Sequence, residues 1–326
     1  MANVRWAMVG TGLMADLILR DFPLSENTEL VALVSRDATR ATAKLSEVGI
    51  DARSLSFEQA IADPEIDVIY IASPHSEHFW MAKAALEAGK HILVEKSFMN
   101  DAGEAAEIYA IAKSKGLFSM EAMWTKFMPL HNELIEIVRS GRIGKLRLIE
   151  ANFGFLRSFD ESHRLFNKEL GGGSSLDQGV YTTTLNRWFA DSPIKHQTTD
   201  GYNYPNGVDA LAMTNFEFEN GVIGKGNSSL GTALGLAARL VGDLGIIEIH
   251  EAFWNTTDAT IKTYQPDSDV AEIELISRPR KGAGYVHMIE AVSNSVLSGE
   301  LENSQHTHAF SLEVMRSLDK TRADLS

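Results

Sequence analysis

Short apolar runs separated by amphipathic segments dominate the first third of the chain. The run Val4–Val9 begins close to the first residue, and Thr28–Val34 and Ile66–Ala72 repeat the pattern. Runs of this length, apolar at almost every position, are typical of parallel strands that are buried on both faces. His91–Val94 and Leu117–Met120 complete the series, and segments typical of helices lie between the runs. The alternation predicts a parallel sheet with right-handed crossover connections.

The helical segments of this region carry start and stop signals. One helix is predicted over Glu77–Ala88, because Gly89 follows its last turn. Another is predicted to run to about Lys115, since Asp101 can cap its start and Gly116 can end it. Both lie between two predicted strands, as crossover helices do.

The pattern changes after Glu121, where strands and helices no longer alternate. Two turn signals, Asn220-Gly221 and Gly242–Gly245, each join two strand-like runs and predict β-hairpins. The other predicted elements are a helix over Leu130–Arg139, a strand over Lys145–Phe153, an irregular stretch over Phe155–Gly173, a helix that is capped by Ser174 or Ser175 and runs to about Phe189, and helices over Tyr285–Leu297 and Ala309–Ala323. We therefore expect an α/β protein with two domains, residues 1–122 around the parallel sheet and residues 123–326 around a mostly antiparallel, open sheet.

The first apolar run leads directly into a glycine-rich turn. The residues Gly10-Thr11-Gly12-Leu13-Met14-Ala15 form a G-x-G-x-x-A pattern between the first strand and a helical segment. In such a turn the first glycine permits a tight bend, the second lets the backbone approach a pyrophosphate, and the small third residue lets helix and strand pack closely. The free N–H groups of the helix then face the phosphates. The pattern predicts a Rossmann dinucleotide-binding domain whose cofactor contacts Gly10–Met14.

The end of the second predicted strand indicates which dinucleotide binds. An acidic residue at this place, against the ribose 2′-hydroxyl, is typical of NAD sites. Here Ser35 occupies the position, with Arg36 beside it and Arg40 one helical turn further on. A hydroxyl and guanidinium groups suit a 2′-phosphate, so we favour NADP(H) over NAD(H) as the cofactor. The alternatives are that Asp37 takes the acidic role, or that both arginines are ordinary surface charges.

Polar residues follow two further strands at the same predicted sheet edge, where ligands collect in open α/β sheets. Ser73-Pro74-His75 follows one strand, with His78 close behind, and Glu95-Lys96 follows the next. We expect these residues to contact the cofactor. The spacing of the two histidines suits a metal, but no set of cysteine, histidine or carboxylate partners accompanies them, so no metal site is predicted. Most lysines are solvated surface charges, and only its place at this edge makes Lys96 a candidate for catalysis.

Composition and charge exclude several classes of function. The 326 residues carry a formal net charge of −14, from 30 basic and 44 acidic residues, which gives no support to binding of nucleic acid or of anionic membranes. No apolar run approaches the roughly 18 residues of a membrane-spanning helix, and the chain contains no cysteine. We therefore expect a cytoplasmic protein with a small-molecule substrate and neither a nucleic-acid nor a membrane partner.

The second half of the chain offers a few candidates for chemistry. Asp177 and Tyr181 lie four residues apart on a predicted helix, so they share one of its faces. Pairing with the helix dipole would also explain the aspartate, and a core position would also explain the tyrosine. Trp124, Phe153 and Trp254 are candidates for an apolar or sugar-stacking wall, with core packing as the alternative for each.

Several of these stretches together resemble one enzyme family. They are Gly10-Thr11-Gly12, Ser73-Pro74-His75 with His78, the run from Ala88 to Lys96, and Asp177-Gln178-Gly179-Val180-Tyr181. Over essentially the whole chain, the combination is similar to the glucose–fructose oxidoreductase/inositol dehydrogenase (Gfo/Idh/MocA) family. Within it, the run from Leu117 to Phe127 looks closest to the branch of dimeric dihydrodiol dehydrogenase and NADP-linked D-xylose dehydrogenase.

Two residues depart from the pattern of the family. Ser97 replaces the proline of the usual Glu-Lys-Pro, which frees the backbone φ and restores an N–H donor. Lys126 stands where the branch usually has arginine. Both departures concern fine positioning more than the class of reaction.

The resemblance implies a Rossmann domain followed by an α/β domain for substrate binding, whose open sheet forms a homodimer or a higher homo-oligomer. The implied reaction is reversible hydride transfer between NADP(H) and a secondary or anomeric alcohol of a sugar, polyol or trans-dihydrodiol. Tyr181 would take the hydroxyl proton with help from the Lys96 ammonium, and Asp177 would accept a substrate hydroxyl or orient the lysine. Trp124 would lie beside the cofactor and the substrate, and Phe153 and Trp254 beside the substrate. The alternative function is a sensor of the same fold that binds NADP(H) and catalyses nothing.

Overall fold

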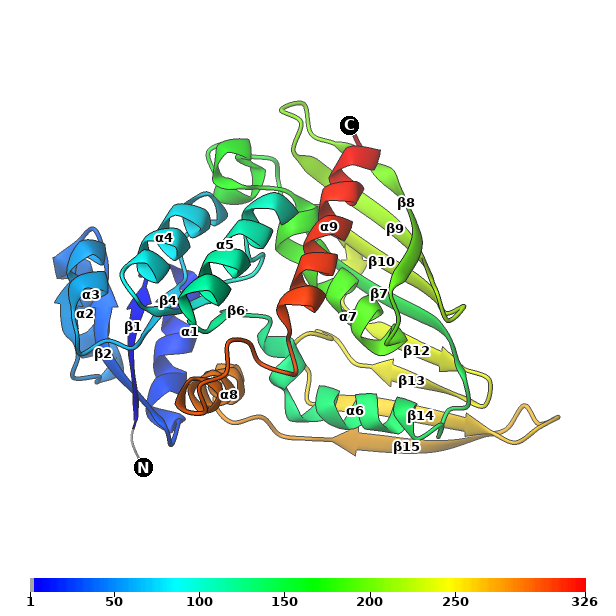
Figure 1. The fold of residues 1–326 in the computed structure, drawn as a ribbon. Coiled ribbons are helices and arrows are strands. Elements are labelled where there is room, and N and C mark those ends of the chain that lie inside the picture. The colour runs from blue at the N-terminus through cyan, green and yellow to red at the C-terminus, as the bar shows by residue number, and fades with distance from the viewer. Residues whose placement is uncertain (1–2) are drawn as a thin grey trace. The chain divides into compact units, whose positions relative to one another are not determined.

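The protein, described here from a computed structural model, divides into two compact units (Figure 1). The structure describes residues 3–326, except for the side chain of Leu13. Unit 1 comprises Met1–Phe127 and Arg280–Leu312, and unit 2 comprises Met128–Pro279 and Glu313–Ser326. The predicted linear division at residue 122 assigns residues 280–312 to the second domain, whereas their packing assigns them to unit 1.

The sheet of unit 1 has six strands in the order β3-β2-β1-β4-β5-β6, and every neighbouring pair is parallel. The strands are β1 (Val4–Val9), β2 (Thr28–Val34), β3 (Arg53–Leu55), β4 (Val68–Ile71), β5 (His91–Val94) and β6 (Ser119–Glu121). The predicted parallel sheet is thus confirmed. The direction of the strand order reverses at β1, and the crevice outside the carboxyl ends of β1 and β4 is where this kind of sheet binds ligands.

The helices of unit 1 connect these strands or pack beside them. They are α1 (Leu13–Asp21), α2 (Ala38–Val48), α3 (Phe57–Ala62), α4 (His75–Glu87), α5 (Ala102–Lys115) and α8 (Tyr285–Leu297), with one-turn helices at Phe22–Leu24 and Trp124–Phe127. Helix α5 has the predicted ends: the side chain of Asp101 accepts the N–H of Glu104, and Gly116 adopts the left-handed conformation.

Helix α4 begins earlier than predicted. It starts at His75 instead of Glu77, with Pro74 as the residue that caps it, so His75 and Ser76 belong to its first turn and not to a loop. Proline suits the start of a helix because it has no N–H that would remain unpaired there. The strand before it is correspondingly short, since Ile66 and Ala72 lie outside β4.

A buried carboxylate attaches the returning segment to unit 1. Asp21, the last residue of α1, accepts hydrogen bonds from the N–H groups of Ala283 (2.8 Å), Tyr285 (2.7 Å) and Val286 (3.2 Å). It thereby caps α8, whose own preceding residue, Gly284, offers no side chain. The cap explains why residues 280–312 pack with the first part of the chain, although they are distant from it in sequence.

The sheet of unit 2 has nine strands. Eight follow the order β15-β14-β13-β12-β7-β10-β9-β8, and β11 pairs with β7. The strands are β7 (Leu146–Leu156), β8 (Ile194–Asn203), β9 (Asp209–Phe218), β10 (Ile223–Ser229), β11 (Gly231–Gly235), β12 (Ala238–Gly242), β13 (Gly245–Ile249), β14 (Asp258–Tyr264) and β15 (Ala271–Ser277). Among the described strands of this sheet, only β7 and β10 pair in parallel, so the predicted mostly antiparallel sheet and both predicted hairpins are confirmed.

The helices of unit 2 lie along one face of this sheet (Figure 1). They are α6 (Pro129–Arg139), α7 (Val180–Ala190) and the later part of α9 (His308–Asp324), which the chain enters from unit 1. Buried Gln197 on β8 illustrates the packing, since its amide bonds with Ser317 and Thr321 of α9. The opposite face of the sheet has no such cover within unit 2.

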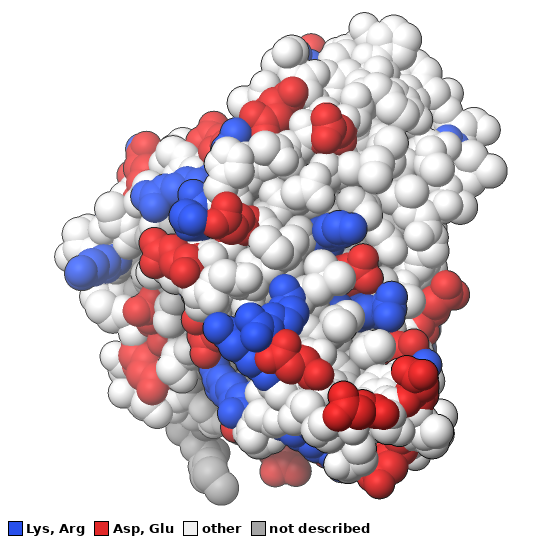
Figure 2. Space-filling model, turned by 90° about the vertical axis from the view of Figure 1, so that its right-hand side faces the viewer, with Lys and Arg blue, Asp and Glu red and all other residues white. Residues whose placement is uncertain are grey.

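None of the helices in the described part of the chain is long and apolar enough to cross a membrane. Figure 2 shows one face of the molecule, on which acidic and basic side chains lie next to each other.

Candidate active site

The glycine-rich turn of unit 1 has the geometry that a dinucleotide needs. Gly10 has a φ of +116°, and a Cβ at this position would lie 2.5 Å from the carbonyl oxygen of Ala72, so only glycine fits. Gly12 differs, because no atom lies within 4 Å of the place where its Cβ would be. It directly precedes α1, whose N-terminus has no side-chain cap. Open space beside an uncapped helix N-terminus fits a pyrophosphate.

The other residues of the turn surround this space. Thr11 is largely buried, and Met14 is half-buried in the first turn of α1. The predicted contact through the side chain of Leu13 falls outside the described part of the structure. The residues present therefore fit the predicted cofactor, and the individual contacts of Gly10–Met14 stay predictions.

Two arginines and a serine lie at the carboxyl end of β2, as predicted. Asp37, the acidic alternative, caps α2: one of its oxygens accepts the N–H of Arg40 at 3.1 Å. Its own N–H donates to the hydroxyl of Ser35 at 3.1 Å. The guanidinium of Arg40 donates to the carbonyl oxygen of Thr11 at 2.9 Å and so supports the glycine turn. Arg36 is exposed.

Lys96 lies just beyond β5, at the carboxyl edge of the sheet. The N–H of Glu95 continues the sheet by donating to the carbonyl oxygen of Ile71 at 2.9 Å. The hydroxyl of Tyr70 donates to the carboxyl group of Glu95 at 2.5 Å. Burial raises the pKa of this carboxyl group, and the hydrogen bond from Tyr70 opposes the rise. Lys96 itself is half-buried and follows a firmly held residue.

His75 contacts the backbone that follows Lys96. Its Nε2 lies 3.1 Å from the carbonyl oxygen of Lys96 and 3.2 Å from the backbone nitrogen of Ser97. The N–H that serine restores in place of the family's proline therefore has a partner, the ring of His75. The ring is almost completely buried.

His78 supports the same stretch of backbone from inside the unit. Its Nδ1 lies 3.1 Å from the carbonyl oxygens of both Ser97 and Phe98, and its Nε2 lies 3.0 Å from the carbonyl oxygen of Ser73. Burial, together with the charge of the neighbouring His75, lowers the pKa of His78 to about 3. His78 has no exposed surface, so its predicted direct contact with the cofactor finds no support in this position.

The other predicted cofactor residues of unit 1 differ in exposure. Ser73 is half-buried and Pro74 is exposed, at the carboxyl end of β4 where a ligand can reach them. Trp124 is 4% exposed and stacks on Tyr285 with 4.6 Å between ring centroids. Most of its ring therefore packs inside unit 1, and its predicted contacts with cofactor and substrate stay predictions.

In unit 2, the predicted helix that carries Asp177 and Tyr181 begins with an unexpected turn. Residues Ser175–Gly179 form a π-helix, and α7 follows at Val180. The prediction that Ser174 or Ser175 caps the helix is wrong, because no side-chain cap is present. A wider turn of this kind is frequent at functional sites.

Asp209, the first residue of β9, holds this turn in place. Its carboxylate accepts the hydroxyl of Ser174 at 2.7 Å, the N–H of Ser175 at 2.6 Å and the hydroxyl of Ser175 at 2.8 Å. The carboxylate is buried, so three donors compensate for its lost hydration. Asp209 on β9 thus accepts an N–H group at the start of this helical segment, the role that was predicted for a serine side chain.

Asp177 pairs with an arginine that the sequence did not single out. Both terminal nitrogens of Arg164 lie 3.3 Å from one carboxylate oxygen of Asp177. Arg164 begins the one-turn helix Arg164–Phe166 in the stretch that was predicted to be irregular. The side chain of Asp177 is 16% exposed and that of Arg164 is 52% exposed, so the pair lies at the surface of unit 2.

Tyr181 lies in an aromatic cluster with both predicted wall residues of unit 2. The rings of Phe153 and Trp254 stack with 3.6 Å between centroids and an interplanar angle of 7°. The ring of Tyr181 lies 5.6 Å from Phe153 and 6.2 Å from Trp254. The structure therefore brings together three predicted site residues that are far apart in sequence. Lys96 belongs to unit 1 and the cluster belongs to unit 2.

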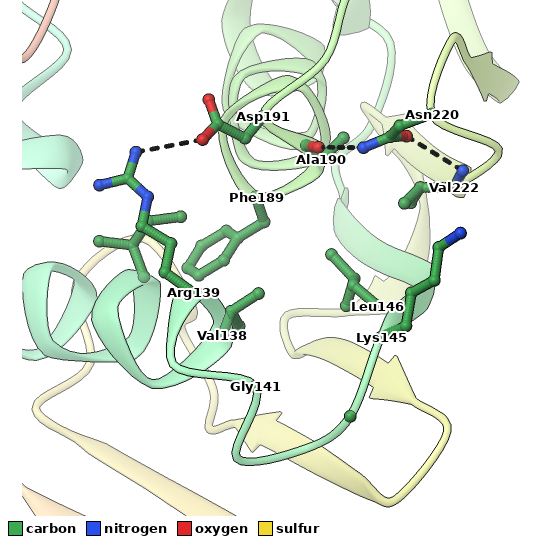
Figure 3. Close-up of a pocket in the computed structure, with 12 residues that line it drawn as sticks. Val138, Arg139, Gly141, Lys145, Leu146, Phe189, Ala190, Asp191, Asn220 and Val222 are labelled. Carbon is green, nitrogen blue, oxygen red and sulfur yellow. Dashed lines mark hydrogen bonds and ion pairs between the residues drawn. The ribbon is translucent and has the colours of Figure 1, made fainter.

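A separate surface pocket of unit 2 contains none of the predicted site residues (Figure 3). Its volume is about 470 Å³, and it lies where α6 and α7 end. Phe189 and Val138 point into it, and two of the polar side chains at its rim are already engaged: Arg139 pairs with Asp191 at 3.3 Å, and Asn220 donates to the carbonyl oxygen of Ala190 at 2.8 Å.

Comparison with known proteins identifies the family. Residues 4–122 match the model of the oxidoreductase family with an NAD-binding Rossmann fold, and residues 131–248 match the model of the GFO/IDH/MocA C-terminal domain. The trans-1,2-dihydrobenzene-1,2-diol dehydrogenase of Sus scrofa is 31% identical over 288 residues, which cover 87% of this chain and 84% of that protein. The chain belongs to the Gfo/Idh/MocA oxidoreductase family. The resemblance deduced from the sequence motifs is confirmed.

Two further comparisons are consistent with membership of the Gfo/Idh/MocA family. The NADP(+)-linked D-xylose 1-dehydrogenase of Hypocrea jecorina is 36% identical over 202 residues, 56% of this chain and 52% of that protein. The solved structure of an aldose-aldose oxidoreductase from Caulobacter crescentus, complexed with glycerol, shares the fold with a TM-score of 0.88, at 22% identity and over 99% of this chain and 97% of that one. The chain is thus an NAD(P)-dependent oxidoreductase, and the alternative of a non-catalytic sensor receives no support.

Sequence reasoning missed several residues that shape the candidate site of this oxidoreductase. Arg164, Asp209 and Tyr70 act through partners that lie 13 to 35 positions away, so no local spacing marks them. One signal was available for Asp209: it opens a segment of alternating residues, and aspartate is a poor strand former, so its presence there calls for a structural explanation.

Proposed function

We propose that the chain catalyses reversible hydride transfer between NADP(H) and a secondary or anomeric alcohol of a sugar, polyol or trans-dihydrodiol. The observation that carries the proposal is the cluster of Tyr181 with the stacked Phe153–Trp254 pair, one helical turn from the Asp177 carboxylate. A tyrosine hydroxyl, a carboxylate and flat aromatic faces are the groups that bind and deprotonate a polyhydroxylated or ring-shaped alcohol.

The cofactor supplies the redox chemistry, because the nicotinamide of bound NADP⁺ takes the hydride from the substrate carbon. The glycine turn and the N-terminus of α1 hold the pyrophosphate, as the open space at Gly12 allows. Ser35 and Arg36 hold the 2′-phosphate, which is our reason for proposing NADP(H) instead of NAD(H). Asp37 supports this preference, because one of its oxygens is engaged as the cap of α2.

The protein itself must handle the proton and orient the substrate. Tyr181 takes the proton of the hydroxyl group, and the Lys96 ammonium favours the phenolate form that this step needs. Asp177 accepts a hydrogen bond from a second hydroxyl of the substrate. Arg164 directs Asp177, since both of its terminal nitrogens donate to one carboxylate oxygen.

The relatives support this choice of substrates. The protein of Sus scrofa carries the name of a trans-dihydrodiol dehydrogenase, and that of Hypocrea jecorina the name of an NADP(+)-linked D-xylose dehydrogenase. The substrates in both names, a trans-dihydrodiol and D-xylose, carry hydroxyl groups on adjacent carbon atoms. A site with one base and one neighbouring carboxylate acceptor suits two adjacent hydroxyl groups.

The test is a turnover assay of the purified protein with NADP⁺ and NAD⁺ against a panel of aldoses, polyols and trans-dihydrodiols. We expect NADP⁺-dependent oxidation of at least one class. Tyr181→Phe should lower kcat by about 10²- to 10⁴-fold with little change in NADPH affinity, because it removes only the proton acceptor. Near-wild-type turnover of this variant would contradict the role of Tyr181.

We further propose that the chain forms a homodimer through the uncovered face of the unit 2 sheet. The residues Ile273, Ile246, Val241, Leu148 and Ile223 form a row across this face, interrupted by Lys262. They are exposed or half-exposed, whereas the alternate row that faces the helices is buried. Ion pairs of both signs flank the row, among them Arg239–Glu150 and Arg147–Asp243. Such a surface can pair with a second copy of itself.

The oligomeric state in solution tests the homodimer. We expect light scattering to give twice the mass of the 35.8 kDa chain. Val241→Lys should convert the dimer to a monomer, because it places a charge in the centre of the apolar row. A monomeric wild-type protein, or a dimer that this substitution leaves intact, would contradict the proposed interface.

A further inference from the structure

Unit 1 contains a completely buried carboxylate to which the proposed mechanism gives no role. Glu121, the last residue of β6, has no exposed surface. One of its oxygens accepts the N–H of Phe98 at 3.1 Å, and the other lies 3.0 Å from Nε2 of His306 and 2.9 Å from the hydroxyl of Ser311. A buried carboxylate loses its hydration, so it persists only where several donors replace the water.

The groups around Glu121 compensate its charge. Burial lowers the pKa of His306, and the hydrogen bond with Glu121 opposes the change. The imidazole is therefore neutral near pH 7, with its proton on Nε2 facing the carboxylate, and its Nδ1 has no hydrogen-bond partner in the described part of the chain. The Lys126 ammonium, also buried, lies 3.6 Å from the ring centroid of Phe310 and supplies a positive charge.

The contact with Phe98 connects this cluster to Lys96, two residues earlier in the chain. The backbone after Lys96 is held by side chains at successive positions: Ser97 by His75, and the carbonyl oxygens of Ser97 and Phe98 by His78. Glu121 holds the remaining group, the N–H of Phe98. These three side chains fix the direction in which this stretch of backbone leaves β5.

The serine at position 97 increases the importance of these contacts. Proline would fix φ at this position through its ring, whereas serine leaves φ free to vary. In this chain the conformation of the stretch therefore depends on hydrogen bonds. The hydrogen bond from the N–H of Phe98 to the Glu121 carboxylate is charge-assisted, and such hydrogen bonds are roughly twice as strong as neutral ones.

We propose that Glu121, held by His306 and Ser311, is a positioning residue that orients Lys96 through the N–H of Phe98. The proposal rests on the proposed function, in which Lys96 assists Tyr181. Glu121 contacts neither substrate nor cofactor in this role. Its effect on the reaction is to keep the ammonium of Lys96 at a fixed place at the carboxyl edge of the sheet.

The experiment compares Glu121→Leu, which removes the acceptor, with Glu121→Gln, which keeps an acceptor oxygen. We expect Glu121→Leu to lower kcat by about 10- to 100-fold, the range that small misplacements of a reacting group cause, while the Kd of NADPH changes less than about threefold. Glu121→Gln should restore most of the lost kcat. Asp21→Asn is the matched control, because Asp21 is a second buried carboxylate of unit 1 that accepts N–H groups far from Lys96.

A second measurement observes Lys96 directly and does not depend on turnover. Reductive ¹³C-methylation labels the lysines, and loss of one signal in Lys96→Met assigns that of Lys96. The signal should shift in Glu121→Leu and stay in place in Asp21→Asn. If Glu121→Leu does not fold, Ser311→Ala and His306→Gln loosen the carboxylate without removing it, and they should shift the same signal to a smaller extent.

The outcomes separate the two proposals. If Lys96→Met keeps its turnover, Lys96 has no catalytic role, and both its place in the proposed function and this inference are wrong. If Lys96→Met loses turnover while the Glu121 variants show wild-type kcat and an unchanged Lys96 signal, the inference alone is overturned. A shifted Lys96 signal together with lowered kcat and preserved NADPH affinity supports the inference. A kcat loss of equal size in Asp21→Asn would show that the effect is general destabilisation, and would contradict the inference.

Discussion

Cofactor choice depends on single residues at the end of β2. The three charged residues there differ in their contacts: Asp37 caps α2, Arg40 donates to the glycine turn, and Arg36 is exposed. Of these three charged residues, Arg36 is the one that can meet a 2′-phosphate without losing a hydrogen bond that the structure shows. The preference for NADPH should therefore depend on this arginine more than on Arg40.

Substitutions of the two arginines should have different effects. Arg36→Ala should weaken NADPH binding by about 10- to 100-fold, the loss expected for a hydrogen bond between charged groups, and leave NADH binding nearly unchanged. Arg40→Ala should weaken both cofactors, because its partner is the backbone of Thr11 in the turn that holds the shared pyrophosphate. Quenching of tryptophan fluorescence measures the four dissociation constants. Equal losses for both cofactors in Arg36→Ala would contradict the assignment of NADP(H).

At the scale of the elements, the π-helix before α7 depends on one distant carboxylate. Asp209→Asn replaces the charged acceptor of three hydrogen bonds with an amide, and we expect it to cost about 2 to 4 kcal/mol of folding stability. It should also lower kcat, because the π-helix carries Asp177. Urea denaturation and the turnover assay check both effects. Asp200→Asn, an exposed aspartate on the neighbouring strand β8, is the control and should change neither. Wild-type stability of Asp209→Asn would show that the serines hold the turn by other means.

The bounds of the helices and strands show how far the sequence predicts this fold. The strands β1 and β2 and the helix α8 have the predicted bounds or nearly so, because apolar periodicity and end signals are local properties of the chain. The cap of the π-helix could not be predicted, since Asp209 lies about 35 residues from the serines that it holds. The helix predicted from Glu77 begins at His75 instead, directly after Pro74, and proline is well suited to the start of a helix.

In the candidate site, too, local sequence features were predictable and contacts between distant residues were not. Phe153, Tyr181 and Trp254 were proposed from residue type and from family resemblance, and the fold of unit 2 brings their rings together. Arg164 was missed, because it lies in a stretch without periodicity and its role depends on folding back toward Asp177. His78 was assigned to the cofactor, but its place inside α4 directs it to backbone carbonyl groups. Residue type thus indicates which side chains are candidates, whereas the partner that each side chain meets depends on the fold.

At the scale of the whole molecule, each unit encloses a histidine that must stay uncharged. His78 in unit 1 and His131 in unit 2 have no exposed surface. Burial lowers the pKa of His78 to about 3 and that of His131 to about 4. His131 keeps one hydrogen bond, 2.7 Å from its Nε2 to the carbonyl oxygen of Phe253. The stability of each unit is therefore coupled to pH through a buried histidine.

Acidification should destabilise the protein well above the pH at which carboxylates titrate. In the unfolded chain these histidines bind protons near pH 6.5, whereas in the folded protein they do so only near the lowered values, so the unfolded state gains protons first as the pH falls. Each histidine should cost about 2 kcal/mol at about pH 5 relative to pH 8, and the loss should grow until the pH reaches its folded pKa. Urea midpoints measured between these two pH values test this dependence. His131→Gln, whose amide can still donate to Phe253, should reduce the dependence, while the same change at exposed His196 should not. A pH dependence that His131→Gln leaves unchanged would show that His131 is already protonated in the folded protein, and that its burial does not keep it neutral.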